Sequence, residues 1–344
     1  MTTQISFDHP IQVYKSQYTH GLKLALVPKE GAGVEIIENG TIEPIIESII
    51  SNIVQKGFFC LDLGTNYGHL AISMAFSAGE FGEVHAYEAN PLIHEYAKLS
   101  AWLNGLESHS LYFYNFAISD VSGKEILFDG GASTYVGKVL TNDDIEYYTY
   151  GAINLFTAIK SIFAYFGVIS YQSYTMSVDD IMSNHANKTL NFLRADIEGS
   201  ECRMLQGAVK SIPQFPDIII FMEWEPTSIK KLSTEQDISF CVQFLKNEDF
   251  KLLQLDVNYA DLDLKLTNET LKLIDIEHLL NKGDKGEYIL LRDLNVVDSI
   301  LSICSNCRDH DVLSFDNNTN IQDSFGFSSF NLSQEITFTE TGDL

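Results

Sequence analysis

The sequence predicts an α/β fold with a mostly parallel sheet of seven strands, an antiparallel seventh strand and helices on both faces. From Phe58 onward, short apolar runs typical of buried strands alternate with segments of helical periodicity. The composition, 45% hydrophobic and 20% charged over 344 residues, is that of a folded chain with a large core. Only short, polar helical pieces precede the last strand, over 266–282, so we expect that strand to run antiparallel.

Residues 1–57 are predicted to form a β/α lead-in. Two apolar segments, 21–28 and 33–38, are interpreted as strands. Pro44 near the start of IEPIIESIISNIVQ is typical of a first helical turn, and the Ile and Val spacing that follows is helical.

Residues 58–292 are predicted to form the main domain, in which strands and helices alternate. The helix over 67–79 ends at a glycine, the helix at Pro91 begins with a proline, and Ser233 is the expected cap of the helix that follows it. The expected strands are 58–63, 83–88, 111–118, 189–196, 217–224, 249–257 and 287–293, with a small extra one at 124–128, and the expected helices are 67–79, 91–105, 177–184, 200–208 and 233–248.

Two segments depart from this rhythm. Residues 129–176 form an insertion, expected to be a lid or substrate cap, and residues 293–344 form an acidic, polar tail. The insertion contains one long apolar stretch, 153–169, which is short for a membrane span and carries Lys160. We interpret it as a helix covering a pocket or core, and expect no membrane contact.

Charge and the chain's start bear on partners and compartment. A net charge of -25 would repel a phosphate backbone, so no nucleic-acid partner is expected. The start, MTTQISFDHP, has neither the basic region nor the apolar core of an export signal, and the five cysteines are scattered, so a cytoplasmic location is expected. The sequence does not indicate an oligomeric state.

The loop after Leu63 is the first candidate site, because ligands of such sheets bind beyond the carboxyl ends of the strands. Gly64, Asn66 and Gly68 allow a sharp turn, but the spacing is not the G-x-G-x-x-G of dinucleotide binders, and no Gly-Lys-Ser/Thr follows. Asp62 would repel phosphate and suits a cationic cofactor such as S-adenosylmethionine. A plain strand-to-helix turn is the alternative.

Two further acidic segments are expected at the same edge of the sheet. Glu88 lies 24 residues after Gly64, where an acid can accept the two ribose hydroxyls of an adenosine cofactor. In RADIEGSE, Asp196 ends a central strand and Glu198 follows it. The alternative is structural: acids there also favour a helix N-terminus.

These motifs together resemble the FkbM-type methyltransferases. The resemblance rests on DLGTNYG (62–68), AYEANP (86–91), Leu103-Asn104, FAISDVSG (116–123), Val178-Asp179, RADIEGSE (194–201) and FMEWEP (221–226), and it covers roughly 33–292. Two departures are Ala89 in place of the usual proline and Arg194-Ala195 in place of the usual Lys-Ile.

The resemblance implies a Rossmann-like class I methyltransferase fold, S-adenosylmethionine as cofactor, and O-methylation of a small-molecule or glycan hydroxyl. It implies that the methionine part of the cofactor lies along the glycine turn, that Glu88 holds the ribose, and that Asp196 lies near the amino group or the reacting methyl. Asn104 and the Ala117-Ile118 region would then lie near the adenine or support its pocket.

The reaction class requires removal of a hydroxyl proton, for which Asp196, Glu198 and His69 are the candidate bases. Alternatively, a divalent ion held by Asp196 and Glu223 would acidify the hydroxyl. Two other functions remain open at this point. One is a nucleotide-dependent oxidoreductase, which the missing fingerprint disfavours, and the other is a non-catalytic binding module of the same fold.

Overall fold

The structure is a computed structural model that describes residues 12–15, 22–26, 33–34, 36, 43–106, 110–129, 138–139, 170–256, 271–280, 285–295 and 337–338. The apolar stretch 153–169 lies outside the described residues, as do most of the expected insertion and tail. In the described part, no helix is long and apolar enough to cross a membrane.

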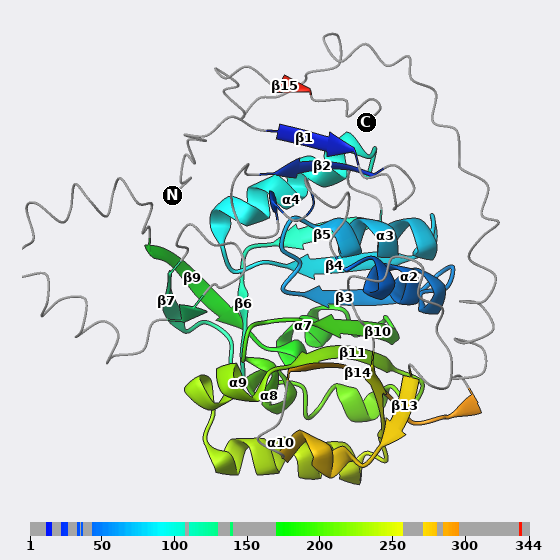
Figure 1. Ribbon diagram of the computed structural model, residues 1–344, viewed down its shortest axis with the longest axis vertical. Coiled ribbons are helices and arrows are strands. Elements are labelled where there is room, and N and C mark those ends of the chain that lie inside the picture. The colour runs from blue at the N-terminus through cyan, green and yellow to red at the C-terminus, as the bar shows by residue number, and fades with distance from the viewer. Residues whose placement is uncertain are drawn as a thin grey trace, which may run out of the picture.

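An eight-stranded sheet forms the centre of the molecule (Figure 1), with strand order β13-β12-β14-β11-β10-β3-β4-β5. The five strands from β11 to β5 are parallel, and β14 runs antiparallel to both of its neighbours. The mostly parallel sheet with an antiparallel last strand is therefore confirmed. The bounds are β3 Phe59–Leu63, β4 Glu83–Tyr87, β5 Leu111–Tyr114, β10 Leu190–Ala195, β11 Ile219–Trp224, β12 Lys251–Leu255, β13 Leu271–Ile274 and β14 Gly286–Leu291.

The eighth strand, β13, forms within a segment where only helical pieces were expected. It pairs antiparallel with β12, from Leu252 opposite Ile274 to Leu255 opposite Leu271. A strand edge carries unpaired N–H and C=O groups, and pairing satisfies them. The 3₁₀ helix η2 (Ile276–Leu280) follows, so the helical expectation holds only for the second half of this segment.

Helices cover the two faces of the sheet and enclose two separate apolar cores (Figure 1). One core packs beneath α2 (Pro44–Ile53), α3 (His69–Ala78) and α4 (Pro91–Leu103). The other packs beneath α7 (Val178–Asn184), α8 (Glu201–Gln206) and α10 (Glu235–Asn247), with α9 (Pro226–Leu232) and the 3₁₀ helix η1 (Ile212–Gln214) beside them. Helix α2 begins at Pro44, as expected.

The strand expected over 111–118 is two strands in two sheets. After β5, the chain turns at Asn115 and Phe116, and β6 (Ala117–Ile118) joins β9 (Ser170–Met176) instead of β4. The Asn115 side chain donates hydrogen bonds to the carbonyls of Glu88 and Ala89, which ends pairing with the main sheet. The smaller sheet is completed by β7 (Glu125–Asp129) and β8 (Lys138–Val139).

Two strands of the lead-in, β1 (Gln12–Lys15) and β2 (Lys23–Leu26), form a three-stranded sheet with β15 (Thr337–Phe338) from the C-terminal segment. The strand expected over 33–38 is wrong where the structure describes it, because residues 33, 34 and 36 are helical. Val34 is only partly buried, whereas Gly33 and Ile36, three positions apart, are buried, which is the spacing of one helix face.

The cap of α10 is Thr234, one residue later than expected. The Thr234 hydroxyl accepts from the Asp237 N–H, and the Asp237 carboxylate accepts from the Thr234 N–H at 2.8 Å, which together form a capping box. The Ser233 hydroxyl is buried and has no hydrogen-bond partner among the described residues.

Thr234→Ala is expected to lower the free energy of unfolding by about 1 kcal/mol, because the variant loses both hydrogen bonds of the Thr234 hydroxyl, the one accepted from the Asp237 N–H and the one donated to the Asp237 carboxylate. Ser233→Ala is the matched control, with a change of less than about 0.5 kcal/mol. Urea denaturation followed by circular dichroism measures both, and equal losses in the two variants would contradict the assignment of the cap.

Candidate active site

Charged side chains gather where the central strands end, on the face of the sheet that α2, α3 and α4 cover. Asp62 on β3 is registered opposite Arg194 on β10, and Glu223 on β11 opposite Glu287 on β14. Asp196 follows β10 directly. The carboxyl ends of the parallel strands, where a crevice is predicted, thus carry a band of ionisable groups across four neighbouring strands.

The glycine turn after β3 lies against the end of β10. The N–H groups of Gly64 and Thr65 both donate to the Tyr87 carbonyl, at 2.9 and 3.0 Å. Gly64 has a φ of 84°, and a Cβ there would lie 1.8 Å from the carbonyl oxygen of Asp196. Only glycine fits at this position, because a side chain would separate the ends of β3 and β10.

The rest of the turn contains two residues in left-handed backbone conformations, Asn66 and Gly68. Asn66 adopts a left-handed conformation with φ of 51°, and its side-chain oxygen accepts from the Tyr67 N–H at 2.8 Å. Gly68 has a φ of 83° and caps α3. Asn and Gly are the residues that take these backbone angles at low cost, which is why this sequence forms a tight turn here.

Glu88 joins the turn to the next strand end. One carboxylate oxygen accepts from the Asn66 N–H and the other from the Asn90 N–H, each at 2.9 Å. Each oxygen keeps a lone pair for another donor. The Asn90 side chain caps α4 through the Leu92 N–H, so the structural interpretation of this segment also holds. Burial raises the pKa of Glu88, although the two N–H donors act in the opposite direction.

Arg194 is the centre of the charged band. Its guanidinium donates to the Asp62 carboxylate at 3.1 Å, to the Gly64 carbonyl at 3.0 Å and to the Asp196 carboxylate at 2.7 Å. Burial disfavours this charge, but Asp62 and Asp196 outweigh it and raise the pKa of Arg194. The charge of Asp62, expected to select a cationic cofactor, is therefore shared with a buried cation.

Several buried polar atoms around the turn lack a partner among the described residues. A buried polar atom without a partner costs free energy, so a cluster of them marks a place where a polar ligand or water fits. They lie on five residues of this region: Asp62 Oδ2, Thr65 Oγ1, His69 Nε2, Arg194 Nε and Glu201 Oε2.

His69, one of the expected bases, is buried in the first turn of α3. Burial and the nearby Arg194 charge lower the pKa of His69 to about 3. The imidazole is thus neutral at neutral pH and holds a proton only weakly, so His69 is a poor general base.

Glu198 and Glu201 lie on the turn after β10 in different environments. Glu198 is partly exposed and has a φ of 54°, whereas Glu201 is buried and accepts from the Ile197 and Gly199 N–H groups. Burial, then the charge of Asp196, raises the pKa of Glu198 to about 8. Burial also raises the pKa of Glu201 to about 8. Glu198 is the candidate base whose proton affinity suits neutral pH.

The sequence analysis missed three charged residues of this region, Glu43, Lys285 and Glu287. Lys285 pairs with Glu223 at 2.5 Å, and burial raises the pKa of Glu223 to about 7. An antiparallel last strand begins at the edge where the parallel strands end, and this was the signal that could have found Lys285 and Glu287. Asn115, which ties β5 to the Glu88 loop, was missed as well.

The metal alternative lacks a ligand set in the described part of the chain. Asp196 directly follows β10, and Glu223 lies near the end of the neighbouring strand β11. However, no group of three or more His, Cys, Asp or Glu side chains is arranged to hold a metal ion among the described residues.

Two expected adenine neighbours lie in different places. Ala117 is on β6, just beyond β5 and the Asn115 turn. Asn104 ends α4, about 20 Å along the helix from Asn90, so the structure does not bring it to the crevice. Its side chain instead exchanges hydrogen bonds with the Lys23 backbone, at 2.9 and 2.7 Å, and holds β2 against α4.

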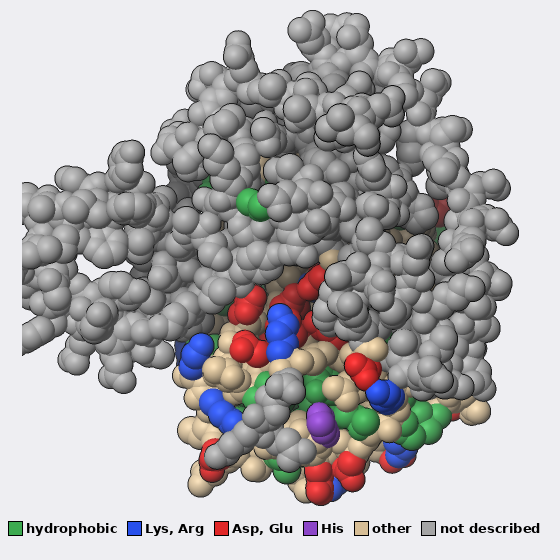
Figure 2. Space-filling model, in the orientation of Figure 1, with side chains coloured by type: hydrophobic (Ala, Val, Ile, Leu, Met, Phe, Trp, Pro, Cys, Tyr) green, Lys and Arg blue, Asp and Glu red, His purple; other side chains and the backbone are tan. Residues whose placement is uncertain are grey.

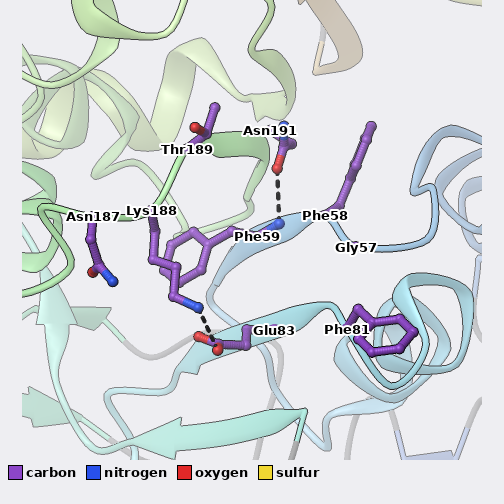
Figure 3. Close-up of a pocket in the computed structure, with 9 residues that line it drawn as sticks. All are labelled: Gly57, Phe58, Phe59, Phe81, Glu83, Asn187, Lys188, Thr189 and Asn191. Carbon is purple, nitrogen blue, oxygen red and sulfur yellow. Dashed lines mark hydrogen bonds and ion pairs between the residues drawn. The ribbon is translucent and has the colours of Figure 1, made fainter.

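A pocket lies at the opposite edge of the sheet, where β3, β4 and β10 begin (Figure 3). Its wall includes the Lys188–Glu83 ion pair and Asn191, which accepts from the Phe59 N–H. This edge holds none of the expected site residues, so the pocket is separate from the candidate active site.

The fold and the site define a class of protein: Rossmann-like α/β enzymes that bind a nucleoside cofactor at a glycine turn and a strand-end acid. The chain belongs to the FkbM methyltransferase family, because the family described as "Methyltransferase FkbM domain" matches residues 62–252, more than half of the 344 residues. The expected family is confirmed. S-adenosylmethionine as the methyl donor agrees with this assignment.

Two methyltransferases are among the solved structures that the chain matches. The FkbM methyltransferase of Methylobacillus flagellatus has 11% identity and a TM-score of 0.38, and the match covers 68% of this chain and 43% of that one. The O-methyltransferase of Bacillus cereus, in complex with SAH, has 13% identity and a TM-score of 0.40, with coverage of 80% and 96%. The chain thus spans less than half of the Methylobacillus protein. No curated protein matches the chain.

The buried acids predict a fall in stability as the pH rises. A carboxyl whose pKa is raised on folding, from 4.5 to about 8 for Glu201, binds its proton more tightly in the folded state, so stability falls between these two pH values. His69 and His85, whose pKa values folding lowers, act oppositely, but only below their unfolded pKa of 6.5. Between pH 7 and 8, Glu201→Gln is expected to reduce the loss of unfolding free energy by about 1 kcal/mol.

Urea midpoints at pH 7 and 8 measure this effect, and Glu80→Gln, at an exposed acid, is the control. The glutamine keeps an oxygen for the two N–H donors of the turn. A pH dependence as steep as that of the unchanged protein would contradict a titrating Glu201.

Arg194→Met is expected to lower the free energy of unfolding by roughly 3–5 kcal/mol, because it leaves Asp62 and Asp196 without their buried cation. Lys188→Met, which breaks the partly exposed pair with Glu83, is the matched control and should cost about 1 kcal/mol or less. Denaturant unfolding measures both. Similar losses would show that the Arg194 contacts add nothing beyond a surface ion pair.

Proposed function

We propose that the protein is an S-adenosylmethionine-dependent O-methyltransferase that acts on a hydroxyl of a small-molecule or glycan acceptor. The observation that carries the proposal is Glu88, whose carboxylate bridges the glycine turn and the next strand end through the Asn66 and Asn90 N–H groups. This contact supports the proposal, because a carboxylate held beside the glycine turn is able to accept hydrogen bonds from the hydroxyls of a ribose.

The residues of the turn fit the cofactor's charged end. Asp62 Oδ2 and Thr65 Oγ1 are buried without partners among the described residues, and they offer an acceptor and a hydroxyl to a bound ammonium and carboxylate. S-adenosylmethionine supplies an activated methyl group on a sulfonium. The protein then has to bind the cofactor and the acceptor, orient them towards each other and exclude water. Holding the two reactants in this geometry lowers the barrier to the transfer.

In this proposal, Glu198 is the general base that removes the proton from the acceptor hydroxyl. It follows Asp196 on the turn after β10, is partly exposed, and has a pKa of about 8, so its carboxylate can hold a proton near neutral pH. Asp196 is held by Arg194 and is 26% exposed at its side chain, which suits a positioning contact with the ligand. His69 is buried and weakly basic.

The acidic composition supports an acceptor that is not a nucleic acid. The chain carries 47 acids against 22 Lys and Arg residues, and the described crevice contains more carboxylates than cations. Phosphate-rich acceptors would be repelled there, whereas neutral polyols or cationic compounds would not.

Glu88→Ala is expected to weaken the binding of S-adenosylhomocysteine by about tenfold or more, because it removes a charged acceptor for two hydroxyls. Asn104→Ala, at the far end of α4, is the control: it should lower stability but leave this affinity within about twofold. Isothermal titration calorimetry measures both variants. If Asn104→Ala weakens binding as much as Glu88→Ala, the cofactor site is not the one described.

Transfer of radiolabelled methyl groups to a fractionated cell extract tests the activity itself. Label in hydroxyl-bearing small molecules or glycans supports the proposal. Binding of S-adenosylhomocysteine without any transfer would leave the non-catalytic binding module as the better account, and label in RNA would contradict the acceptor class.

A further inference from the structure

We propose that Glu223 and Glu287, together with Glu43, form a subsite that binds a protonated amine of the methyl acceptor. The inference rests on the proposed function and names a chemical feature of its acceptor. The amine is a recognition group, and the methylated oxygen lies elsewhere on the same molecule.

The two carboxylates face each other across neighbouring strands. Glu223 and Glu287 are directly opposite in the antiparallel pair β11–β14, so their side chains lie on the same face of the sheet, with Cβ atoms about 5 Å apart. Both are buried, with 3% and 4% of their surfaces exposed. Like charges placed directly opposite are unfavourable, so such a pair favours a nearby cation or a shared proton. Lys285 supplies a cation to Glu223, and no ion pair joins a cation to Glu287 among the described residues.

Glu287 has no hydrogen bond or ion pair to any of the residues that the structure describes. Burial, and then the charges of Glu223, Glu43 and Asp196, raise the pKa of Glu287, although the Arg194 charge acts in the opposite direction. A buried carboxylate without a donor is costly, and a cation at this position would stabilise its ionised form.

The two cations of the described region are already engaged. Arg194 lies between Asp62 and Asp196, and Lys285 pairs with Glu223. Glu43, at the start of α2, lies near the same charges, and burial raises its pKa to about 7. Glu43 and Glu287 thus remain without a paired cation among the described residues.

The position of this subsite fits the acceptor better than the cofactor. Strands are spaced about 4.8 Å apart, so Glu223, two strands from β3, lies about 10 Å from the glycine turn, and Glu287, three strands away, about 14 Å. Asp196, which directly follows β10, lies between the glycine turn and these acids, and Glu198 follows two residues later on the same turn. An amine on the acceptor would therefore bind on the far side of the candidate base from the cofactor.

Ligand access is consistent with the exposure of the neighbouring groups. The side chains of Lys285 and Asp196 are 59% and 26% exposed, so the buried acids lie beneath a partly open edge. Figure 2 shows acidic side chains around a basic one in a hollow of the molecule's surface. Lys285 can turn towards water when a ligand amine takes its place, because its chain is long and its charge well solvated there.

The test compares matched pairs of probes that differ in the amine. Glucosamine with glucose, and tyramine with 4-ethylphenol, are titrated calorimetrically into the protein saturated with S-adenosylhomocysteine. The amine of each pair is expected to bind about tenfold more tightly than its neutral counterpart. In Glu287→Gln, the two dissociation constants of a pair are expected to differ by no more than about twofold. Glu277→Gln, at an exposed acid on η2, should keep the tenfold ratio. Glu43→Gln provides a second variant if Glu287→Gln does not fold.

A preference for amines that Glu287→Gln or Glu43→Gln removes supports the subsite. Equal binding of the two members of each pair, no binding of either, or a preference that survives both substitutions overturns it. Failure of S-adenosylhomocysteine to bind in the first step would instead count against the proposed function.

Discussion

The candidate site depends on one buried cation. The Arg194 guanidinium contacts the end of β3, the glycine turn and the end of β10 at once, through Asp62, Gly64 and Asp196. Without it, two carboxylates would be buried side by side at the point where Gly64 brings the two strand ends into contact. Arginine suits this place because its planar group donates in several fixed directions, whereas the ammonium of lysine is a single point of charge.

The remaining charges of the crevice are not balanced in this way. Beyond Asp196, the described residues place Glu43, Glu198, Glu223 and Glu287 near a single further cation, Lys285. Such a region favours protonated carboxyls when it is empty and ionised ones when a cation binds. The same excess of acids therefore lowers stability at high pH and selects for cationic ligands, which is a common relation between stability and function at binding sites.

Sequence reasoning predicted the parts of the site that depend on local pattern. Gly64, Glu88 and Asp196 each follow a strand that is visible in the sequence, and the parallel order brings strand ends together without further information. The resemblance placed Asn104 near the adenine or in support of its pocket, and the structure shows that its side chain holds β2 against α4. Sequence reasoning also missed β13, because the alternation of that segment is weak and the strand forms by pairing with the free edge of β12. It placed the α10 cap at Ser233, one residue before Thr234, whose hydroxyl makes the capping hydrogen bond.

The direction of β14 decides what the acceptor side of the crevice contains. A parallel strand would deliver its carboxyl end, Leu291 and Arg292, to this edge. Because β14 runs antiparallel between β11 and β12, it delivers Lys285 and Glu287 instead and sets Glu287 opposite Glu223. A one-residue slip of this pairing would turn Glu287 to the other face of the sheet, so the register of two buried strands fixes the acid pair. The chemistry of the acceptor side is therefore a consequence of topology, which local sequence patterns do not contain.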